Sequence, residues 1–339
     1  MNQPEKQTSE ALLELMGASK RFVKPIDTAA RIANLFGAHA KEEVVHAVDR
    51  VDLSIAKGEV VGLVGESGCG KSTLGRMAVG LHSLTEGTRR FRGENIEAMD
   101  AGEQRRKQLG IQMIFQDPYA SLNPRMRVLD IVGEAPVAHG MIAGREQSAY
   151  VESLLQRVGL DPAVLRRFPH QFSGGQRARV GIARALAVKP EFLVCDEAVA
   201  ALDVSIQAQV LNLFINLRDE LNLTYLFISH DLGVVRHLSD RVVIMYLGRV
   251  VESARADDVF ARANHPYTQA LLASAPKLEA RKTEFFAVKG EIPSPLNPPP
   301  GCHFHPRCPH AMPRCSVEKP ALKEISPAHF SACHLNDQR

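Results

Sequence analysis

Residues 65–72 combine glycines, a lysine and a serine in the order G-x-x-x-x-G-K-[S/T], the spacing of a phosphate-binding loop. In such a loop the glycines let successive backbone N–H groups point at phosphate oxygens, and the following helix start adds a favourable dipole. Lys71 would reach the β- and γ-phosphates, and the Ser72 hydroxyl would hold Mg²⁺. The predicted nucleotide site consists of Gly65, Glu66, Ser67, Gly68, Cys69, Gly70, Lys71, Ser72 and Thr73.

The segments on either side of this motif are those that a phosphate-binding loop requires. A buried-strand pattern over residues 59–65 leads into it, and a helical pattern over residues 72–81 follows. The motif alone arises by chance in roughly one chain in a hundred of this length, as a plain glycine-rich turn. Because the flanking elements are also correct, the sequence predicts a nucleotide-binding protein.

Two adjacent carboxylates, Asp196 and Glu197, end another apolar segment, residues 191–196. Ligands of open α/β folds collect at the carboxyl ends of strands, where these two acids would lie. Asp196 is predicted to support Mg²⁺, usually through water, and Glu197 to polarise the water that attacks the γ-phosphate. The alternative interpretation is a pair of solvated acids that cap a strand.

A second glycine pair occurs in the sequence Ser173-Gly174-Gly175-Gln176, just before a helical run over residues 177–187. Its backbone N–H groups lie at a helix start and could bind a second phosphate group. By itself, this short pattern is more often a plain helix-capping loop.

Apolar segments rich in β-branched residues recur along the chain and alternate with helical patterns. The strand-like segments are residues 59–65, 110–116, 191–196, 224–229 and 241–248, and helical spacing is clearest over residues 204–222. This alternation predicts a parallel, doubly wound α/β sheet. Between about 117 and 190 the strand signals fade, so we expect an inserted helical subdomain there. Residues 24–43 are interpreted as a loop insertion between two early strands.

The composition is that of a globular protein, with 339 residues of which 45% are hydrophobic and 23% charged. A net charge of +3 gives nucleic-acid binding no special support. No apolar run approaches the roughly 18 residues needed to span a bilayer, so we expect a cytosolic chain. Ten of the twenty prolines fall between residues 293 and 327, which predicts a loop-rich tail beyond about residue 277.

Four of the six cysteines lie in this tail, at Cys302, Cys308, Cys315 and Cys333. They are separated by five, six and seventeen residues, a spacing that does not specify a metal. Four thiolates could close a tetrahedral site and supply the order that a proline-rich tail lacks. From spacing alone Zn²⁺ ranks first, an iron–sulfur cluster second and unligated buried thiols third.

Taken together, the motifs resemble those of the ATP-binding cassette (ABC) ATPases. The phosphate loop is followed by Gln116 after a strand, FSGGQ at residues 172–176, Asp196 with Glu197, Asp203 after an alanine and a leucine, and then His230. This resemblance implies ATP hydrolysis and an α/β fold of the P-loop NTPase (RecA-like) type, with an inserted helical subdomain and a small loop-rich C-terminal cysteine domain.

The resemblance also implies individual roles. Glu197 is the catalytic base, and His230 contacts the γ-phosphate. Gln116 is a ligand of Mg²⁺ and links the γ-phosphate site to a membrane partner. Phe22 is placed to stack on adenine, although a lone phenylalanine is more often part of a core.

Cassettes of this family pair head to tail, so Ser173 and Gly175 would cover the ATP held by the other subunit. Asp203 lies in the loop that communicates across this pair. Ala198 and Ala200 stand where many relatives carry proline and serine. Neither change removes a charged catalytic group, so hydrolysis is expected to survive, whereas coupling between the two sites is less firmly implied.

Three further segments narrow the resemblance to the second ATPase subunit of dipeptide and oligopeptide import systems: residues 265–272, residues 290–295 and the cysteine run. It implies an ABC ATPase domain at 1–276, with its helical subdomain at about 117–190, and a peptide-importer-type C-terminal domain at 277–339. It also reverses the metal ranking and places a [4Fe-4S] cluster on the four cysteines, with Zn²⁺ as the alternative.

The partners implied are a paralogous ABC ATPase subunit in a heterodimer, two transmembrane permease subunits and a substrate-binding protein, with no nucleic acid. The chain would lie peripherally on the cytoplasmic face of a bacterial inner membrane. The alternatives are an importer of another small solute, such as glutathione, a nickel chelate or a sugar, and a soluble ABC ATPase that acts on ribosomes or nucleic acid. A redox-sensing role for the cysteine tail is a third possibility.

Overall fold

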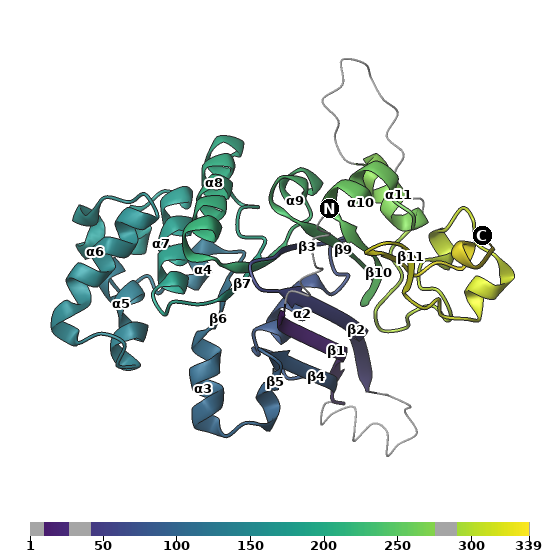
Figure 1. Ribbon diagram of the computed structural model, residues 1–339, viewed down its shortest axis with the longest axis horizontal. Coiled ribbons are helices and arrows are strands. Elements are labelled where there is room, and N and C mark those ends of the chain that lie inside the picture. Colours follow the sequence, from purple (N-terminus) through teal and green to yellow (C-terminus); the bar gives the residue numbers. More distant parts are fainter. Residues whose placement is uncertain (1–9, 27–41, 275–289, 339) are drawn as a thin grey trace, which may run out of the picture.

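A computed structural model describes residues 10–26, 42–274 and 290–338 of the chain (Figure 1). An eight-stranded sheet runs through it in the order β11-β12-β10-β9-β3-β8-β7-β6. Its parallel part contains β9 (Arg241–Tyr246), β3 (Val60–Val64), β8 (Thr224–Ile228), β7 (Phe192–Asp196) and β6 (Ile111–Ile114). Its antiparallel edge contains β10 (Arg249–Arg255), β12 (His329–Ser331) and β11 (Lys323–Ser326).

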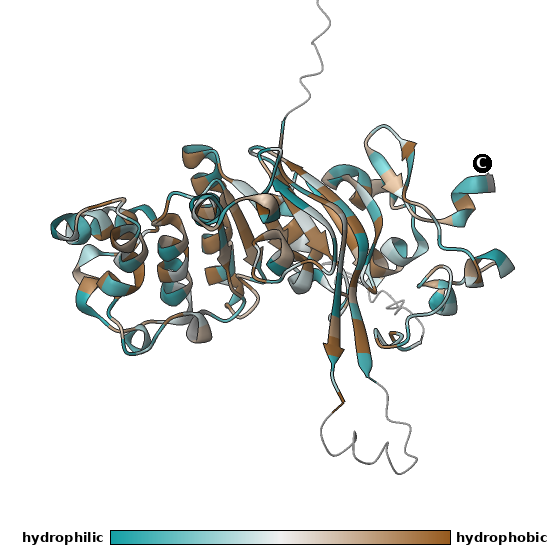
Figure 2. Ribbon diagram, turned by 90° about the horizontal axis from the view of Figure 1, so that it is seen from below, coloured by the Kyte–Doolittle hydropathy of each residue, from teal (hydrophilic) through white to brown (hydrophobic). Residues whose placement is uncertain are grey.

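The parallel strands are mostly apolar because both faces of the sheet are covered. In β7, Phe192 and Val194 belong to a core shared with two long early strands and helix α2 (Lys71–Ala78). Leu193 and Cys195, which point the other way, belong to the core under the helices that follow β6. Figure 2 shows hydrophobic positions gathered along the central strands between these layers.

A separate four-stranded antiparallel sheet covers α2, in the order β2-β1-β4-β5. Its strands are β1 (Ala11–Lys24), β2 (Glu43–Ala56), β4 (Glu86–Phe91) and β5 (Glu94–Asn95). The predicted parallel sheet is therefore present as the central part of the larger sheet, and this second, antiparallel sheet lies beside it. From Val51 to Ile55, β2 alternates between buried and exposed residues, the pattern of an antiparallel sheet with one wet face. Residues 27–41 of the predicted insertion lie outside the described residues.

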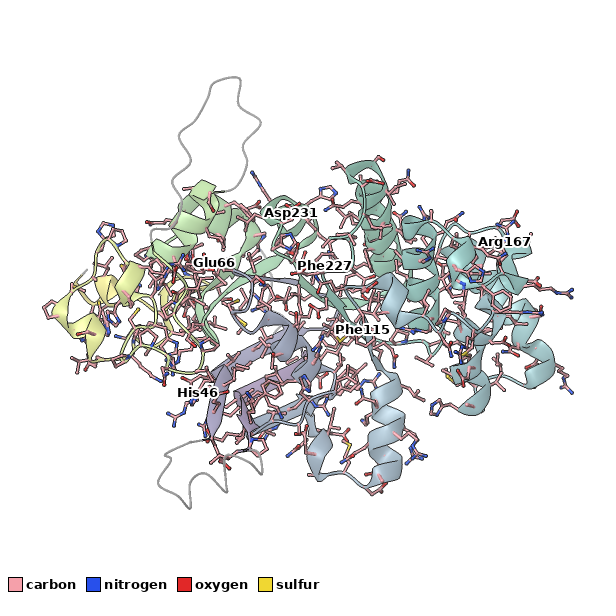
Figure 3. The ribbon with its side chains drawn as sticks, turned by 180° about the vertical axis from the view of Figure 1, so that it is seen from behind. His46, Glu66, Phe115, Arg167, Phe227 and Asp231 are labelled. Atoms are coloured by element: carbon pink, nitrogen blue, oxygen red, sulfur yellow. The ribbon has the colours of Figure 1, made fainter. Side chains whose placement is uncertain are left out.

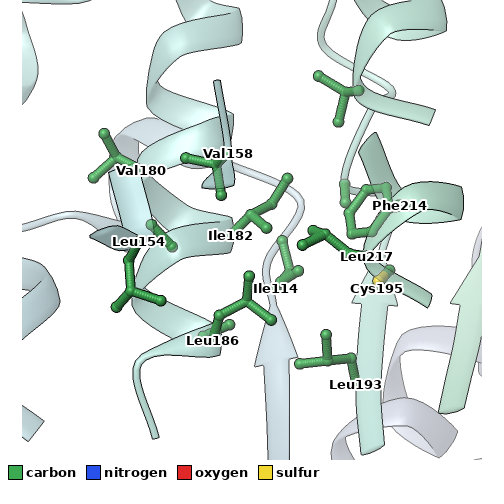
Figure 4. Close-up of a cluster of buried hydrophobic side chains, with 14 of the residues drawn as sticks. Ile114, Leu154, Val158, Val180, Ile182, Leu186, Leu193, Cys195, Phe214 and Leu217 are labelled. Atoms are coloured by element: carbon green, nitrogen blue, oxygen red, sulfur yellow. The ribbon is translucent and has the colours of Figure 1, made fainter. Parts of the chain in front are cut away.

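Helix α3 (Ala101–Leu109) precedes β6. Four α-helices come after β6 and before β7: α4 (Pro118–Ser121), α5 (Val128–Ala138), α6 (Gln147–Arg157) and α7 (Gly174–Leu186). Their core is continuous with that of the sheet, as Figure 4 shows for Leu154 and Ile182 beside Ile114 and Leu193. Helix α8 (Val204–Leu221) packs against α7 and completes this layer. Among the described helices, none has the length and apolar character that a bilayer crossing requires.

The C-terminal part is built onto the β9 edge of the main sheet (Figure 1). Helices α9 (Leu232–Leu238), α10 (Ala256–Arg262) and α11 (Pro266–Ser274) lead into residues 290–338, here called the cysteine segment. That segment contains the β11–β12 hairpin and three short 3₁₀ helices, His305–Arg307, Pro313–Ser316 and His334–Gln338. Phe304 is buried against Tyr246 and Tyr267, so the cysteine segment shares a core with β9 and α11. The predicted boundary near residue 277 lies outside the described residues.

A fully buried carboxylate, Glu252 on β10, fastens the cysteine segment and the start of α11 to the sheet. It accepts hydrogen bonds from the backbone N–H groups of Asn264 (2.7 Å) and His265 (2.9 Å), and its Oε1 lies 2.7 Å from Nε2 of His329. The ring of His265 in turn accepts the N–H of Tyr267 at Nδ1, 3.0 Å away. Burial lowers the pKa of His265 to about 4, so this ring is neutral at pH 7.

The low pKa of His265 predicts that acid destabilises the fold. Below its ordinary pKa of 6.5 the unfolded chain binds a proton that the folded ring refuses, so the free energy of unfolding falls as the pH drops from 7 towards 4. His265 should account for a loss of about 2 kcal/mol at pH 5. His265→Gln keeps a hydrogen-bond acceptor but does not titrate. In urea unfolding, its free energy of unfolding should therefore fall between pH 7 and pH 5 by about 2 kcal/mol less than that of the wild-type chain. The exposed His237→Gln is the control, and an unchanged pH dependence in His265→Gln would contradict the assignment.

Candidate nucleotide site

The phosphate-binding loop connects β3 to α2, and neighbouring backbone fixes its path. Gly68 and Gly70 have φ of 78° and 105°, a left-handed conformation that favours glycine. A Cβ atom on Gly65 would lie 2.2 Å from the carbonyl oxygen of Met245, and one on Gly70 would lie 2.2 Å from that of Ala47. The glycines therefore allow the loop to pack closely between β9 and β2.

Lys71, the first residue of α2, is buried with its ammonium inside this loop. Its Nζ donates to the carbonyl oxygens of Gly65 (2.7 Å) and Glu66 (2.9 Å). A nucleotide phosphate would meet the charge there, close to the loop amides. This donor set fits a polyphosphate, because it joins one cation to a ring of N–H groups at a helix start.

Ser72 and Asp196 form an oxygen pair beside the loop. The Ser72 hydroxyl donates to Oδ1 of Asp196 at 2.8 Å, and Asp196 is 2% exposed at the end of β7. Burial raises the pKa of Asp196, so a divalent cation that stabilises its charged form would suit the position. A hydroxyl and a carboxylate, completed by phosphate oxygens and water, are the ligands that Mg²⁺ prefers.

Three of the predicted residues meet at the carboxyl ends of adjacent strands. Gln116 follows β6, Glu197 follows β7 and His230 follows β8. Nε2 of Gln116 donates to Oε2 of Glu197 at 2.7 Å, and Nδ1 of His230 lies 3.3 Å from its Oε1. Glu197 has a φ of 48°, a strained conformation for a residue with a side chain and one found preferentially at functional sites. The alternative of two solvated acids at a strand end does not account for this convergence.

The second glycine pair forms the start of α7. The Ser173 hydroxyl accepts the N–H of Gln176 (3.3 Å), and Oε1 of Gln176 accepts the N–H of Ser173 (3.1 Å), which is a capping box. Gly174 and Gly175 face the start of α8, and a Cβ on Gly175 would lie 2.4 Å from Cγ2 of Ile206. Ser173 is exposed, and so is Asp203, which stands at the N-cap position of α8 without a side-chain capping hydrogen bond, so this surface is open to another molecule.

Phe22 lies near the end of β1 on the antiparallel sheet and is 38% exposed. Its ring packs edge-on against that of His82, with the centroids 5.3 Å apart, and Nζ of Lys20 lies 5.2 Å from its centroid. The sequence did not predict that His82 and Lys20 lie against this ring. The adenine-stacking role of Phe22 stays a prediction.

Sequence reasoning also missed two residues that contact the phosphate-binding loop from the C-terminal part. The hydroxyl of Tyr267 accepts the N–H of Glu66 at 2.9 Å. The guanidinium of Arg307 donates to both carboxylate oxygens of Glu66, at 2.7 and 3.0 Å. The partners are 201 and 241 residues apart, so no local pattern relates them. The sequence did contain one indication of such a contact. Glu66 is an acid in an anion-binding loop, and its charge needs a compensating cation from elsewhere in the chain.

The four cysteines of the tail have free thiols. The N–H of Cys302 donates to the carbonyl oxygen of Cys315 at 2.8 Å. Burial, with smaller contributions from the nearby thiols of Cys315, Cys333 and Cys308, raises the pKa of Cys302 to about 11. Within residues 10–26, 42–274 and 290–338, no three His, Cys, Asp or Glu side chains are arranged to hold a metal ion. Neither the [4Fe-4S] cluster nor the Zn²⁺ alternative is therefore supported by the arrangement of the described side chains.

Comparison with known proteins gives matches to both parts of the chain. A family model described as "ABC transporter" matches residues 48–200, and one described as "Oligopeptide/dipeptide transporter, C-terminal region" matches residues 251–315. The oligopeptide transport ATP-binding protein AppF of Bacillus subtilis (strain 168) is 52% identical over 330 residues, covering 96% of this chain and 98% of AppF. The chain belongs to the ABC transporter ATPases.

Further relatives, in sequence and in structure, support this assignment to the family. YkfD of the same organism is 51% identical over 300 residues, covering 87% of this chain and 91% of YkfD. The dimeric structure of MJ0796, described as a bacterial ABC transporter cassette, superposes with a TM-score of 0.61 at 27% identity, covering 72% of this chain and 98% of that one. The resemblance inferred from motif order and the α/β P-loop fold are confirmed. As an ABC ATPase, the chain hydrolyses ATP.

The position of Glu197 predicts a separation of binding from turnover. Glu197→Gln removes the base but leaves an oxygen that can accept from Gln116, so Mg-ATP affinity should stay within about threefold while steady-state turnover falls about 100-fold or more. Titration with a fluorescent ATP analogue and a phosphate-release assay would measure the two quantities. The exposed Glu103→Gln is the matched control. Turnover at the normal rate in Glu197→Gln would show that another group is the base.

Proposed function

We propose that this ABC ATPase powers the import of oligopeptides or dipeptides through partner membrane subunits. The observation that carries the proposal is the C-terminal region, which matches the oligopeptide/dipeptide transporter model over residues 251–315 and packs directly on the phosphate-binding loop. The relative AppF, 98% of which is covered, is an oligopeptide transport ATP-binding protein, and this supports the same cargo class.

The described geometry supports a division of roles in the ATPase step. Lys71 and the loop amides would bind the phosphates, and Ser72 and Asp196 would hold Mg²⁺, which supplies charge neutralisation at the γ-phosphate. Glu197 would accept a proton from the attacking water. Gln116 would keep Glu197 oriented through the 2.7 Å hydrogen bond between their side chains.

A composite site would complete this machinery, with Ser173 of one cassette covering the ATP of another. Ser173 is exposed at a helix start, and Val204, just after Asp203, is 83% exposed although it is apolar. A single exposed apolar residue is common on protein surfaces, so the exposed helix start at Ser173 is the stronger support for a covered surface. We propose that the partner is a paralogous ABC ATPase, in a heterodimer whose closed form ATP favours and hydrolysis releases.

The remaining partners follow from the proposed transport role. Two permease subunits would receive the chain on the cytoplasmic face of the inner membrane, and a substrate-binding protein would deliver the cargo. Nothing in the composition favours nucleic acid, since the net charge is only +3. Import of glutathione, a nickel chelate or a sugar would be a different outcome of the same transport experiment.

Uptake by host cells tests this function directly. Deletion of the gene for this chain should abolish uptake of labelled di- and oligopeptides. Expression of the wild-type chain should restore uptake, and expression of the Glu197→Gln variant should not. Labelled glutathione, nickel and sugar serve as parallel substrates. Undiminished peptide uptake after deletion would overturn the proposal, and loss of only a parallel substrate would replace the cargo class.

We further propose that Cys302, Cys308, Cys315 and Cys333 bind a [4Fe-4S] cluster. The four thiols lie near enough to raise one another's pKa, yet they are not set for a single ion. A [4Fe-4S] cluster takes four cysteine thiolates as ligands, the number that this segment provides. When bound, the cluster would supply a covalent cross-link to a segment that has few regular elements.

The cluster proposal predicts iron and sulfide in chain purified without oxygen, at about four of each per chain. The protein should be brown, and Cys302→Ser should lose most of the iron because one of four ligands is gone. Cys195→Ala, which alters a buried cysteine on β7, should retain it. Stoichiometric zinc without iron in the wild-type chain would contradict the proposal.

A further inference from the structure

A glutamate occupies the second position of the phosphate-binding loop, where the surrounding groups attract anions. Glu66 has its backbone in the ring of loop residues, and its carbonyl oxygen accepts from the Lys71 ammonium at 2.9 Å. Its side chain is 23% exposed, so water screens its negative charge only partly. An uncompensated carboxylate in the loop would repel the phosphates that the loop binds.

Arg307 compensates this charge from the cysteine segment. Its guanidinium binds both oxygens of Glu66 in a forked arrangement, at 2.7 and 3.0 Å, and its side chain is 4% exposed. Nη1 also lies 3.4 Å from the hydroxyl of Tyr246, and the guanidinium carbon is 5.8 Å from the centroid of that ring. Such a planar, bidentate pair fixes both orientation and charge. In Figure 3, Glu66 is labelled where the sheet meets the C-terminal segment.

An aromatic cluster holds this ion pair against the loop. The rings of Tyr246, Tyr267 and Phe304 lie 4.7 to 5.4 Å apart, and Tyr267 accepts the N–H of Glu66. Arg307 therefore reaches the loop from a packed base. It also directly precedes Cys308, so the segment that carries the cysteines delivers the arginine.

We propose that Arg307 is a positioning residue of the nucleotide site: it neutralises Glu66 and holds the phosphate-binding loop in the shape that receives Mg-ATP. The inference rests on the proposed role of that loop in ATP binding. It makes the cysteine segment a structural part of the ATP site, acting through Glu66 rather than by touching the nucleotide.

Removal of Arg307 leaves the Glu66 carboxylate uncompensated near the phosphates. Arg307→Ala should weaken Mg-ATP binding about 10-fold. Because the cause is charge repulsion, added salt should reduce the difference in Mg-ATP affinity between this variant and the wild-type chain. The double variant Arg307→Ala/Glu66→Gln removes the repelling charge and should bind within about threefold of wild type. The rate at saturating ATP should change less than the affinity, since Glu197 and Gln116 are untouched.

The experiment is an equilibrium titration of the full-length chain with a fluorescent ATP analogue and Mg²⁺, at low and high salt. Arg314→Ala is the matched control, because Arg314 lies in the same segment and pairs with Glu318 and Asp337 at the surface. Its affinity should equal that of wild type. If Arg307→Ala does not fold, Arg307→Gln, which keeps a long polar side chain but carries no charge, tests the same charge relationship with and without Glu66→Gln.

The outcomes separate this inference from the proposed function. Wild-type affinity in Arg307→Ala would overturn it, and so would a double variant as weak as the single one, since packing and not charge would then be the cause. A wild-type chain that binds no Mg-ATP would instead contradict the role assigned to the loop.

Discussion

The structure depends on one constraint: a short loop between β3 and α2 must turn its backbone N–H groups inward while other backbone lies against its outside. Gly65 and Gly70 satisfy it, because a Cβ at either position would collide with a carbonyl oxygen of β9 or β2. The loop is thus shaped by two different sheets. Phosphate binding by main-chain groups requires this rigidity, since the N–H groups must already point at the anion before it arrives.

The same sheet places the groups that would act on the γ-phosphate. Parallel strands end at one edge, so residues that follow β6, β7 and β8 become neighbours although they are far apart in the chain. Gln116, Glu197 and His230 are brought together in this way. The left-handed backbone of Glu197 turns its side chain into the group, and its N–H donates to the carbonyl oxygen of Ile228 at 3.0 Å. The strand ends thus hold a strained residue in place.

The sequence predicted the buried strands because an uninterrupted apolar run such as residues 192–195 fits a sheet covered on both faces. It predicted the phosphate-binding loop because the residue types and spacing of residues 65–72 are enough to specify the local backbone conformation. It did not predict the antiparallel sheet, whose long strands depend on pairing between distant segments such as β1 and β4. Nor did it predict the contacts of Tyr267 and Arg307 with Glu66, which local periodicity cannot encode. The C-terminal part therefore contributes to the nucleotide site in a way that only the tertiary structure reveals.

Amide hydrogen exchange of the full-length chain, with and without Mg-ATP, tests the central claim most directly, because it reports on the main-chain N–H groups themselves. The account predicts slower exchange at residues 65–73 when the isolated chain binds Mg-ATP, and slower exchange at residues 173–176 only when a partner cassette is also present. Unchanged exchange at residues 65–73 under saturating Mg-ATP would contradict it.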